Sequence, residues 1–242
     1  MQPKMRIEIW SDVVCPFCYI GKRHFEDALR QFQHTTDLQI IWKSFLLAPE
    51  TPEQREGPAL SYAEALAQRK GFSPEQVAGM FQHVTDMARA AGLDFHLEKA
   101  VATSTLRAHR LIQAAQAKGL GDTMEETLFK AFFVEGKDIG DLETLTKLGE
   151  QAGLSEAEAK AAFTEERFAQ AVARDIEEAR QLGISGVPFF VLDRKYGVSG
   201  AQPVEVFSQS LEKAFSEWRA QHPEKSLQVE GGPACTPDGI CE

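Results

Sequence analysis

The chain has 242 residues, of which 43% are hydrophobic and 26% charged, a composition typical of a globular protein with one large domain or two small ones. Its formal net charge of −10 argues against a nucleic-acid partner, because binding to phosphates requires a basic face. No apolar run is long enough to cross a bilayer, and the first residues lack the features of an export signal, so we expect a cytoplasmic protein with no membrane or nucleic-acid partner.

The N-terminal part of the chain has a strand–helix–strand pattern. Residues 5–11 alternate as a strand does, with Ile7 and Ile9 on one side. Apolar residues then repeat at helical spacing over 25–32, and the run 38–45 is rich in β-branched and aromatic residues. This order predicts a βαβ unit with a parallel pair of strands.

From about residue 61 to 183 the pattern is helical throughout, and we expect five to seven short helices and no strand. Ser73-Pro74 is typical of an N-cap followed by proline at the first helical position. Asp122 with Glu125 resembles a capping box, which would start another helix.

Strand character returns over 187–200, where two apolar runs flank Asp193-Arg194-Lys195, a pattern that predicts an antiparallel hairpin. Pro203 opens a final helix with one apolar stripe. The expected fold class is therefore α/β, with a βαβ half and a ββα half that form one four-stranded sheet around a helical insertion. The predicted boundaries are 1–58 and 184–221 for the two halves, 59–183 for the inserted helical domain and 222–242 for a loosely packed tail.

Two of the four cysteines, Cys15 and Cys18, lie where the first strand pattern becomes helical. If the helix begins at Pro16, Cys15 is its N-cap and Cys18 lies one turn further on the same face. Free N–H groups and the helix dipole stabilise a thiolate at an N-cap, and such placement lowers a cysteine pKa from ~8.5 to between ~3.5 and ~7.5. We expect an exposed, nucleophilic Cys15 and a resolving Cys18, which together carry out thiol–disulfide exchange.

Two other interpretations of this pair stay open. Cysteines that only fill the core would be inert, although a pair that flanks a helix-opening proline fills a core poorly. A zinc site would need two further ligands, which Cys235 and Cys241 or nearby histidines would supply. We favour the redox interpretation, with neither a metal nor a cofactor.

A proline leads the later strand run at Val187-Pro188, where it forfeits a hydrogen-bond donor of the sheet. It is therefore expected at a sheet edge or in a cis bond. A cis bond would expose the backbone of Val187, with which an extended substrate peptide would pair beside the dithiol. From spacing alone, a trans proline that merely starts the strand is an equal alternative.

The segments SDVVCPFCYIGKRHFE and GVPFFV…VSGAQPVEVF resemble the FrnE-like oxidoreductases of the DsbA-like branch of the thioredoxin superfamily, over about residues 5–220. The resemblance implies a thioredoxin fold with a helical domain between its halves, a redox-active Cys15–Cys18 pair, and a cis Val187–Pro188 bond that faces it. It implies an oxidoreductase or isomerase of protein and peptide disulfides, with glutathione or a thioredoxin-type reductant as candidate electron partner.

The same branch contains glutathione-dependent isomerases that act on 2-hydroxychromene-2-carboxylate and the kappa-class glutathione transferases. Those enzymes have serine where this chain has Cys15, so two sulfurs favour dithiol chemistry. A glutathione-dependent enzyme stays as the alternative, and a holdase or metal-binding module is the non-enzymatic one.

The tail contains a second pair, Cys235 and Cys241, around the turn sequence Pro237-Asp238-Gly239. A disulfide there would close a loop too small to stabilise the fold by much. We hypothesise a second redox-active disulfide, which exchanges with the first pair or protects it from over-oxidation. A metal site shared by all four cysteines is the alternative.

The sequence indicates the roles of other residues around the dithiol less directly. Asp12 is expected to end the first strand rather than to relay protons. Lys22 and Arg23 are expected to be solvated. Phe17 and Tyr19 are candidates for the rim of a peptide groove.

Overall fold

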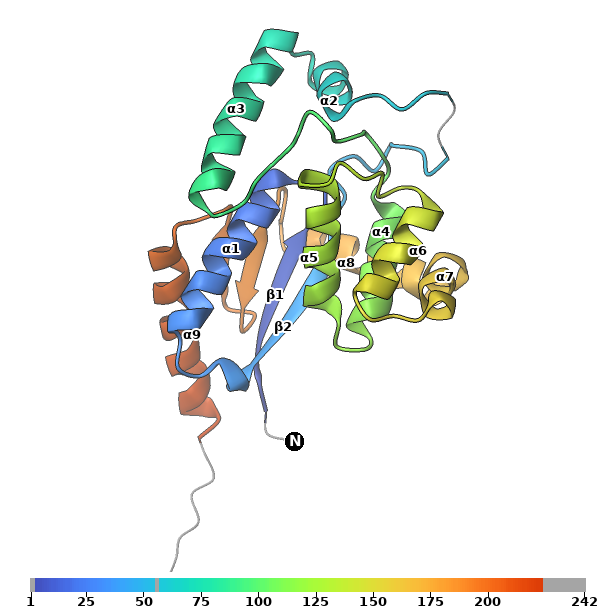
Figure 1. The fold of residues 1–242 in the computed structure, drawn as a ribbon. Coiled ribbons are helices and arrows are strands. Elements are labelled where there is room, and N and C mark those ends of the chain that lie inside the picture. Colours follow the sequence, from blue (N-terminus) through green and yellow to red (C-terminus); the bar gives the residue numbers. More distant parts are fainter. Residues whose placement is uncertain (1–2, 55–56, 224–242) are drawn as a thin grey trace, which may run out of the picture.

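The computed structural model describes residues 3–54 and 57–223 of the chain (Figure 1). The strands in this part are β1 (Met5–Ser11), β2 (Leu38–Ser44), β3 (Phe189–Leu192) and β4 (Tyr196–Ser199). Its α-helices are α1 (Pro16–Gln31), α2 (Tyr62–Lys70), α3 (Pro74–Ala90), α4 (Leu106–Gln116), α5 (Gly121–Phe133), α6 (Leu142–Gln151), α7 (Glu156–Thr164), α8 (Glu166–Gln181) and α9 (Val204–Gln221). Apart from residues 222 and 223, the predicted tail lies outside the described residues.

The four strands form one sheet in the order β2-β1-β3-β4. β1 is parallel to β2, with Met5 opposite Leu38, and antiparallel to β3, which is itself antiparallel to β4. Helices α2 to α8 come between the two halves. The predicted α/β thioredoxin fold with a helical insertion is therefore confirmed, while the exact domain boundaries stay a prediction.

β1 is buried on both of its faces. Ile7 and Ile9 belong to a large apolar cluster shared with α1 and α9, which lie together on one face of the sheet (Figure 1). On the other face Trp10 packs with Ala179 of α8, and its indole Nε1 donates to the carbonyl of Asp175 at 2.9 Å. Apart from the exposed Arg6, every residue of the central strand is buried.

Because α8 covers this second face, Glu8 of β1 is buried as well. Its carboxylate pairs with Arg6 at 2.8 Å and with Arg194, which lies in the turn between β3 and β4. Asp193 and Arg194 both have positive φ, 49° and 55°, as the two central residues of a hairpin turn with the favoured twist require. The predicted hairpin is confirmed, and the Glu8–Arg194 ion pair ties its turn to β1.

The helix starts in the insertion follow the sequence signals in part. Ser73 caps α3 and forms a capping box with Gln76, as expected. The expected capping box of Asp122 and Glu125 is wrong, because α5 begins at Gly121 with Leu120 as its N-cap. Glu125 is instead buried.

The inserted helices share one apolar cluster with the sheet and its flanking helices. The ring of Tyr19 in α1 stacks on Phe129 of α5 at 4.8 Å between centroids. Phe95 and Phe133 extend this stack at 4.6 Å from each other. Tyr19 is therefore a core residue, and its expected place on the rim of a groove is wrong.

Polar side chains of the insertion cover the free edge of β2. Gln116 of α4 accepts a hydrogen bond from the Trp42 N–H at 2.8 Å and donates to the Trp42 carbonyl at 3.1 Å. Asp175 of α8 accepts from the Ser44 N–H at 3.0 Å and from Lys43 Nζ at 2.7 Å. These side chains occupy the backbone groups that another strand would otherwise pair with.

We predict that Asp175→Ala lowers the free energy of unfolding by about 3 kcal/mol, because it leaves the buried Ser44 N–H without its acceptor and removes one of the two carboxylates that pair with Lys43. Urea unfolding followed by circular dichroism measures this change. The exposed Asp86, which pairs with Arg89 on the surface of α3, is the matched control, and its alanine variant should be as stable as the wild type. Equal stability of the two variants would contradict a role for Asp175 in covering the edge.

Candidate active site

Cys15 and Cys18 lie at the junction between the end of β1 and the start of α1. Cys15 is the N-cap of α1 and Pro16 its first residue, as the sequence predicts. The Cys15 N–H donates to the carbonyl of Asp12 at 2.8 Å, and the Cys18 N–H donates to the carbonyl of Cys15 at 3.0 Å. Both cysteines are free thiols in this structure, held one helical turn apart.

The expectation that Cys15 is exposed is wrong, since only 4% of this residue and 1% of Cys18 are accessible. The Cys15 side chain makes no capping hydrogen bond to α1. Its Sγ instead donates to the carbonyl of Val187 at 3.5 Å. A main-chain segment 172 residues away in sequence therefore covers the sulfur, while the neighbouring Phe17 is exposed.

Val187 and Pro188 immediately precede β3 and are joined by a cis peptide bond, as the resemblance implies. The Pro188 carbonyl accepts a hydrogen bond from the Gly200 N–H at 2.8 Å, which ties this segment to the end of β4. A Cβ atom placed on Gly21 of α1 would lie 3.1 Å from Pro188 Cγ. Glycine at position 21 therefore allows the proline ring to pack directly on the helix that carries the two cysteines.

The surroundings of the Cys18 sulfur favour its protonated form. Burial raises the pKa of the Cys18 thiol well above its usual range, and the adjacent Cys15 raises it further. Cys18 is therefore protonated at neutral pH in the reduced protein. Such a thiol is a poor first nucleophile and is suited to a second, internal step.

Asp12 is fully buried just before the dithiol and does more than end the strand. Its Oδ2 accepts a hydrogen bond from the Leu47 N–H at 2.8 Å, and its Oδ1 lies 3.4 Å from Nε2 of His109 in α4. The carboxylate thus holds the loop after β2 and a helix of the insertion against the cysteine loop. Sequence reasoning missed His109, because a lone histidine in a helical pattern carries no spacing signal.

Tyr62, the first residue of α2, is the second residue near the dithiol that sequence reasoning missed. Its hydroxyl donates to the carbonyl of Val14 at 3.0 Å. Burial, together with the nearby Cys15 and Asp12, raises the pKa of Tyr62, so the phenol stays neutral. The bond fixes the residue that precedes Cys15 to the insertion.

Lys22 and Arg23, which we expected to be solvated, lie between α1 and α5. Only 2% of Lys22 is accessible, and its ammonium lies 3.2 Å from Glu126 and also pairs with Glu26. Arg23 donates to Glu26 at 2.7 Å and pairs with Glu126. The charges that follow Cys18 along α1 therefore bind the insertion rather than water.

Glu125 of α5 is buried close to this ion cluster. Its Oε2 has no hydrogen-bond partner among the described residues. Burial raises the pKa of the Glu125 carboxyl well above its usual range, and the positive charge of Lys22 opposes this rise. The protonated form of Glu125 is therefore favoured in the folded protein.

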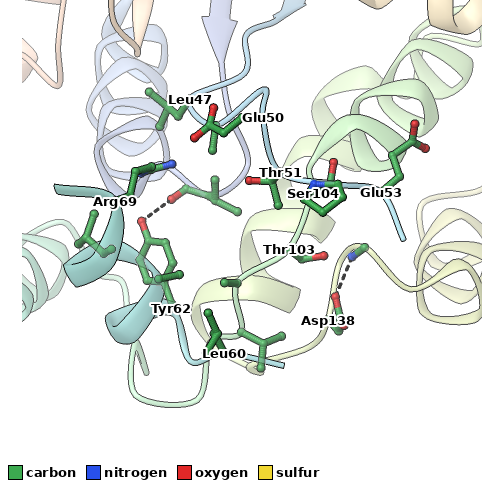
Figure 2. A pocket seen from close by; sticks show the side chains of 18 of the residues that line it. Leu47, Glu50, Thr51, Glu53, Leu60, Tyr62, Arg69, Thr103, Ser104 and Asp138 are labelled. Carbon is green, nitrogen blue, oxygen red and sulfur yellow. Dashed lines mark hydrogen bonds between the residues drawn. The ribbon is translucent and has the colours of Figure 1, made fainter. Parts of the chain in front are cut away.

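A cavity of about 1330 Å³ opens beside the cysteine loop, and Val14 and Tyr62 form part of its wall. Figure 2 shows Tyr62 among the side chains that line it. The loop after β2, helix α2 and the loops before α4 and α6 enclose the rest of it. Val14, the residue before Cys15, is therefore shared between the cavity wall and the cysteine loop, and the Cys15 sulfur itself contacts the Val187 carbonyl.

Cys235 and Cys241 lie outside the described residues. In the part of the chain that is described, no three or more histidine, cysteine, aspartate or glutamate side chains gather as they would around a metal ion. The same part contains no helix with the length and apolarity needed to span a membrane.

The chain is similar to one protein family, and to individual proteins found by sequence and by structure. A model of the DSBA-like thioredoxin domain family matches residues 6–212. A probable DsbA oxidoreductase from Streptomyces coelicolor is 36% identical in sequence and has a TM-score of 0.81, with 98% of each chain covered. YwbO from Bacillus subtilis (strain 168) is 27% identical over 209 residues, which cover 86% of this chain and 96% of that protein.

The cytosolic disulfide reductase DsbM from Pseudomonas aeruginosa has the same fold. Its TM-score is 0.62 at 21% identity, with 88% of this chain and 99% of that chain covered. A structure of DsbM with GSH is similar to the same extent, with a TM-score of 0.63.

We predict that Glu125→Gln makes the stability less dependent on pH. Because the folded protein binds the Glu125 proton more tightly than the unfolded chain does, this group favours folding most below its unfolded pKa of ~4.3, and the advantage is lost as the pH rises toward the folded pKa. Between these two pKa values, titration of Glu125 should lower the free energy of unfolding by up to about 1.4 kcal/mol per pH unit. Glutamine does not titrate, so the variant should lack this contribution to the pH dependence.

Urea unfolding at pH 5, 6, 7 and 8 measures the slope. Glu143→Gln, at an exposed glutamate on α6 that pairs with Lys147, is the control and should keep the wild-type slope. An identical slope for the wild type and Glu125→Gln would contradict the raised pKa.

Proposed function

Because this chain belongs to the DSBA-like thioredoxin domain family, we propose that it is a thiol–disulfide oxidoreductase that acts on protein disulfides through Cys15 and Cys18. The observation that carries the proposal is the contact of Cys15 Sγ with the Val187 carbonyl at 3.5 Å, with Cys18 one helical turn behind. A nucleophile, a resolving thiol and a main-chain acceptor for the substrate are the three parts that disulfide exchange with a polypeptide requires.

In the reducing direction, the Cys15 thiolate attacks one sulfur of a substrate disulfide. A mixed disulfide forms, and the second substrate sulfur leaves as a thiolate and takes up a proton. Cys18 then loses its proton and attacks Cys15 Sγ, which releases the first substrate sulfur as a thiolate. The substrate has gained two electrons, and Cys15 and Cys18 are joined in a disulfide. Oxidation of a substrate dithiol is the same sequence in reverse.

Val187 supplies the binding site for the substrate backbone in this proposal. Its carbonyl accepts from the Cys15 thiol in the reduced protein, and it becomes available when that proton is lost. An extended substrate segment then donates an N–H to it, as in the addition of a strand to a sheet edge. The two-residue segment Val187–Pro188 thus holds the substrate sulfur next to Cys15.

Glutathione or a thioredoxin-type reductant is the proposed electron partner, and the cytoplasm the proposed location. The similarity to DsbM, a cytosolic disulfide reductase whose structure is also known with GSH, supports both. In this cycle, two glutathione thiols reduce the Cys15–Cys18 disulfide in two exchange steps and are oxidised to glutathione disulfide.

The tail pair, Cys235 and Cys241, is the proposed auxiliary centre. Twelve residues lead from residue 223 to Cys235, a contour length of ~40 Å, whereas α9 carries the chain only ~27 Å along its 18 residues. The tail is therefore long enough for its cysteines to return to the end of α9 that lies beside Pro188.

We predict that Cys15→Ser lowers the rate of insulin-disulfide reduction by at least ~10²-fold, because the attacking sulfur is lost. Cys18→Ser should instead accumulate a one-to-one mixed disulfide with the substrate, because the resolving step is blocked. Turbidity measures the rate, and non-reducing mass spectrometry detects the adduct. The unchanged thermal stability of both variants is the control. Glutathione-dependent turnover of a small electrophile that survives Cys18→Ser would favour the glutathione-dependent enzyme instead.

A second prediction concerns the tail. Joint replacement of Cys235 and Cys241 by serine should slow the recycling of the oxidised protein by its reductant and leave the first mixed-disulfide step unchanged, because only electron supply is affected. Stopped-flow measurement of the two steps separates them. Unchanged recycling would reject the auxiliary role, and zinc in freshly purified wild type, absent from the serine variant, would favour the shared metal site.

A further inference from the structure

Ser11, the last residue of β1, is a polar residue on the apolar face of the sheet that packs against α1. Every second side chain of a strand points to the same face. Ile7 and Ile9 precede Ser11 at such positions, and both belong to the apolar cluster that also contains Cys18 of α1. Ser11 is fully buried, as Cys18 is. A hydroxyl group therefore lies where the pattern of the strand favours an apolar side chain.

The buried hydroxyl of Ser11 is left without a hydrogen-bond partner. Its Oγ forms no hydrogen bond within the described part of the chain. By contrast, Ser44, which lies opposite Ser11 on β2 and is equally buried, accepts a hydrogen bond from Gln113 at 3.1 Å. A buried polar group without a partner destabilises the fold, so one that lies among reacting groups indicates a role in their chemistry.

The Cys18 sulfur is the reacting atom next to this hydroxyl. The Ser11 hydroxyl and the main-chain N–H of Asp12 both lower the pKa of Cys18, because each is placed to donate a hydrogen bond to its thiolate. Burial and the adjacent Cys15 raise this pKa. In the mixed disulfide Cys15 is bonded to the substrate and carries no charge, whereas the two donors stay in place and Tyr62 stays neutral. The balance therefore shifts toward the thiolate when Cys18 has to attack.

Both donors are held in position before the reaction begins. The Ser11 carbonyl accepts a hydrogen bond from the Phe45 N–H at 3.0 Å, which fixes the end of β1 to β2. The Asp12 carbonyl accepts from the Cys15 N–H at 2.8 Å, and its carboxylate accepts from the Leu47 N–H at 2.8 Å. Donors fixed where negative charge develops need no reorganisation during the step, which makes them effective in catalysis.

We propose that Ser11 is a catalytic residue of the resolving step, in which its hydroxyl and the Asp12 N–H donate hydrogen bonds to the Cys18 thiolate as it forms. Cys18 gives up its proton, and its thiolate attacks Cys15 Sγ. The bond between Cys15 and the substrate sulfur breaks, and the substrate sulfur leaves with the electron pair and takes up a proton. Ser11 keeps its own proton throughout. The inference rests on the proposed function and deepens it, since it assigns a residue to the second exchange step.

The two exchange steps are measured separately in a parent protein with Cys235→Ser and Cys241→Ser, in which Cys15 and Cys18 are the remaining cysteines. Stopped-flow absorbance follows its reaction with excess DTNB, an aromatic disulfide with a coloured leaving thiolate. Attack by Cys15 releases one equivalent of this thiolate in a phase whose rate rises with the DTNB concentration. Closure of the Cys15–Cys18 disulfide releases the second equivalent in a phase whose rate does not.

Ser11→Ala should slow the second phase roughly three- to tenfold at pH 7 and leave the first within about twofold of the parent. A hydrogen bond to a charged group changes a pKa by about one to two units, and the greater nucleophilicity of a more basic thiolate offsets part of the loss. The pH profile of the second phase should move to higher pH. Ser11→Thr keeps the hydroxyl and should restore the second phase to within about twofold of the parent.

Ser44→Ala is the matched control, because it removes the hydroxyl of an equally buried serine that is bonded to Gln113. It should keep both phases and lose stability in urea. Ser11→Ala should be at least as stable as the parent, since it removes a hydroxyl that has no partner. An unchanged second phase in Ser11→Ala, an equal slowing of both phases, or a Ser11→Thr variant as slow as Ser11→Ala would each overturn the inference.

The trace of the parent protein separates this inference from the proposed function. A parent that releases only one equivalent of the coloured thiolate forms no Cys15–Cys18 disulfide, and the proposed function then fails together with the inference. A parent with two phases, and a Ser11→Ala variant whose second phase is unchanged, would leave the proposed function standing and reject the role of Ser11 alone.

Discussion

The antiparallel pairing of β1 with β3 is the constraint on which the dithiol site depends. Trp10 lies opposite Phe189 in this register, so the chain that leaves β1 and the chain that enters β3 meet at the same end of the sheet. This is why Cys15 contacts the Val187 carbonyl although the two residues are far apart in sequence. β1 is buried on both faces and paired on both edges, so this end of the sheet has little freedom to move.

The helical insertion completes the site in several ways at once. It covers the edge of β2 with Gln116 and Asp175, and it holds the cysteine loop through His109 and Tyr62. The same helices share the apolar cluster of the sheet and enclose the cavity beside Val14. The insertion thus fixes the position of the cysteine loop and encloses a cavity next to it.

Much of the site follows from short-range pattern. The N-cap position of Cys15, the proline that opens α1 and the capping box at Ser73 each depend on neighbours within one helical turn, and the structure agrees with all three. The hairpin around Asp193 is likewise local, because two residues of positive φ decide the turn. The order of strands and helices follows from where the spacing of apolar residues changes between the strand pattern and the helix pattern. This order was sufficient to predict the α/β class.

Burial, by contrast, depended on contacts between segments far apart in the chain. Cys15 is covered by Val187, Lys22 is enclosed by carboxylates of α5, and Tyr19 stacks on Phe129, so in each case a distant element removes water from a residue that looks exposed in its own helix. The cavity is also a product of packing, since its wall combines stretches that are far apart in the chain. Periodicity records which face of a helix is apolar, but it holds no information about which other segment packs there. The packing of distant segments sets the accessibility of the groups around the two sulfurs and raises the pKa of Cys18 and Tyr62 by burial.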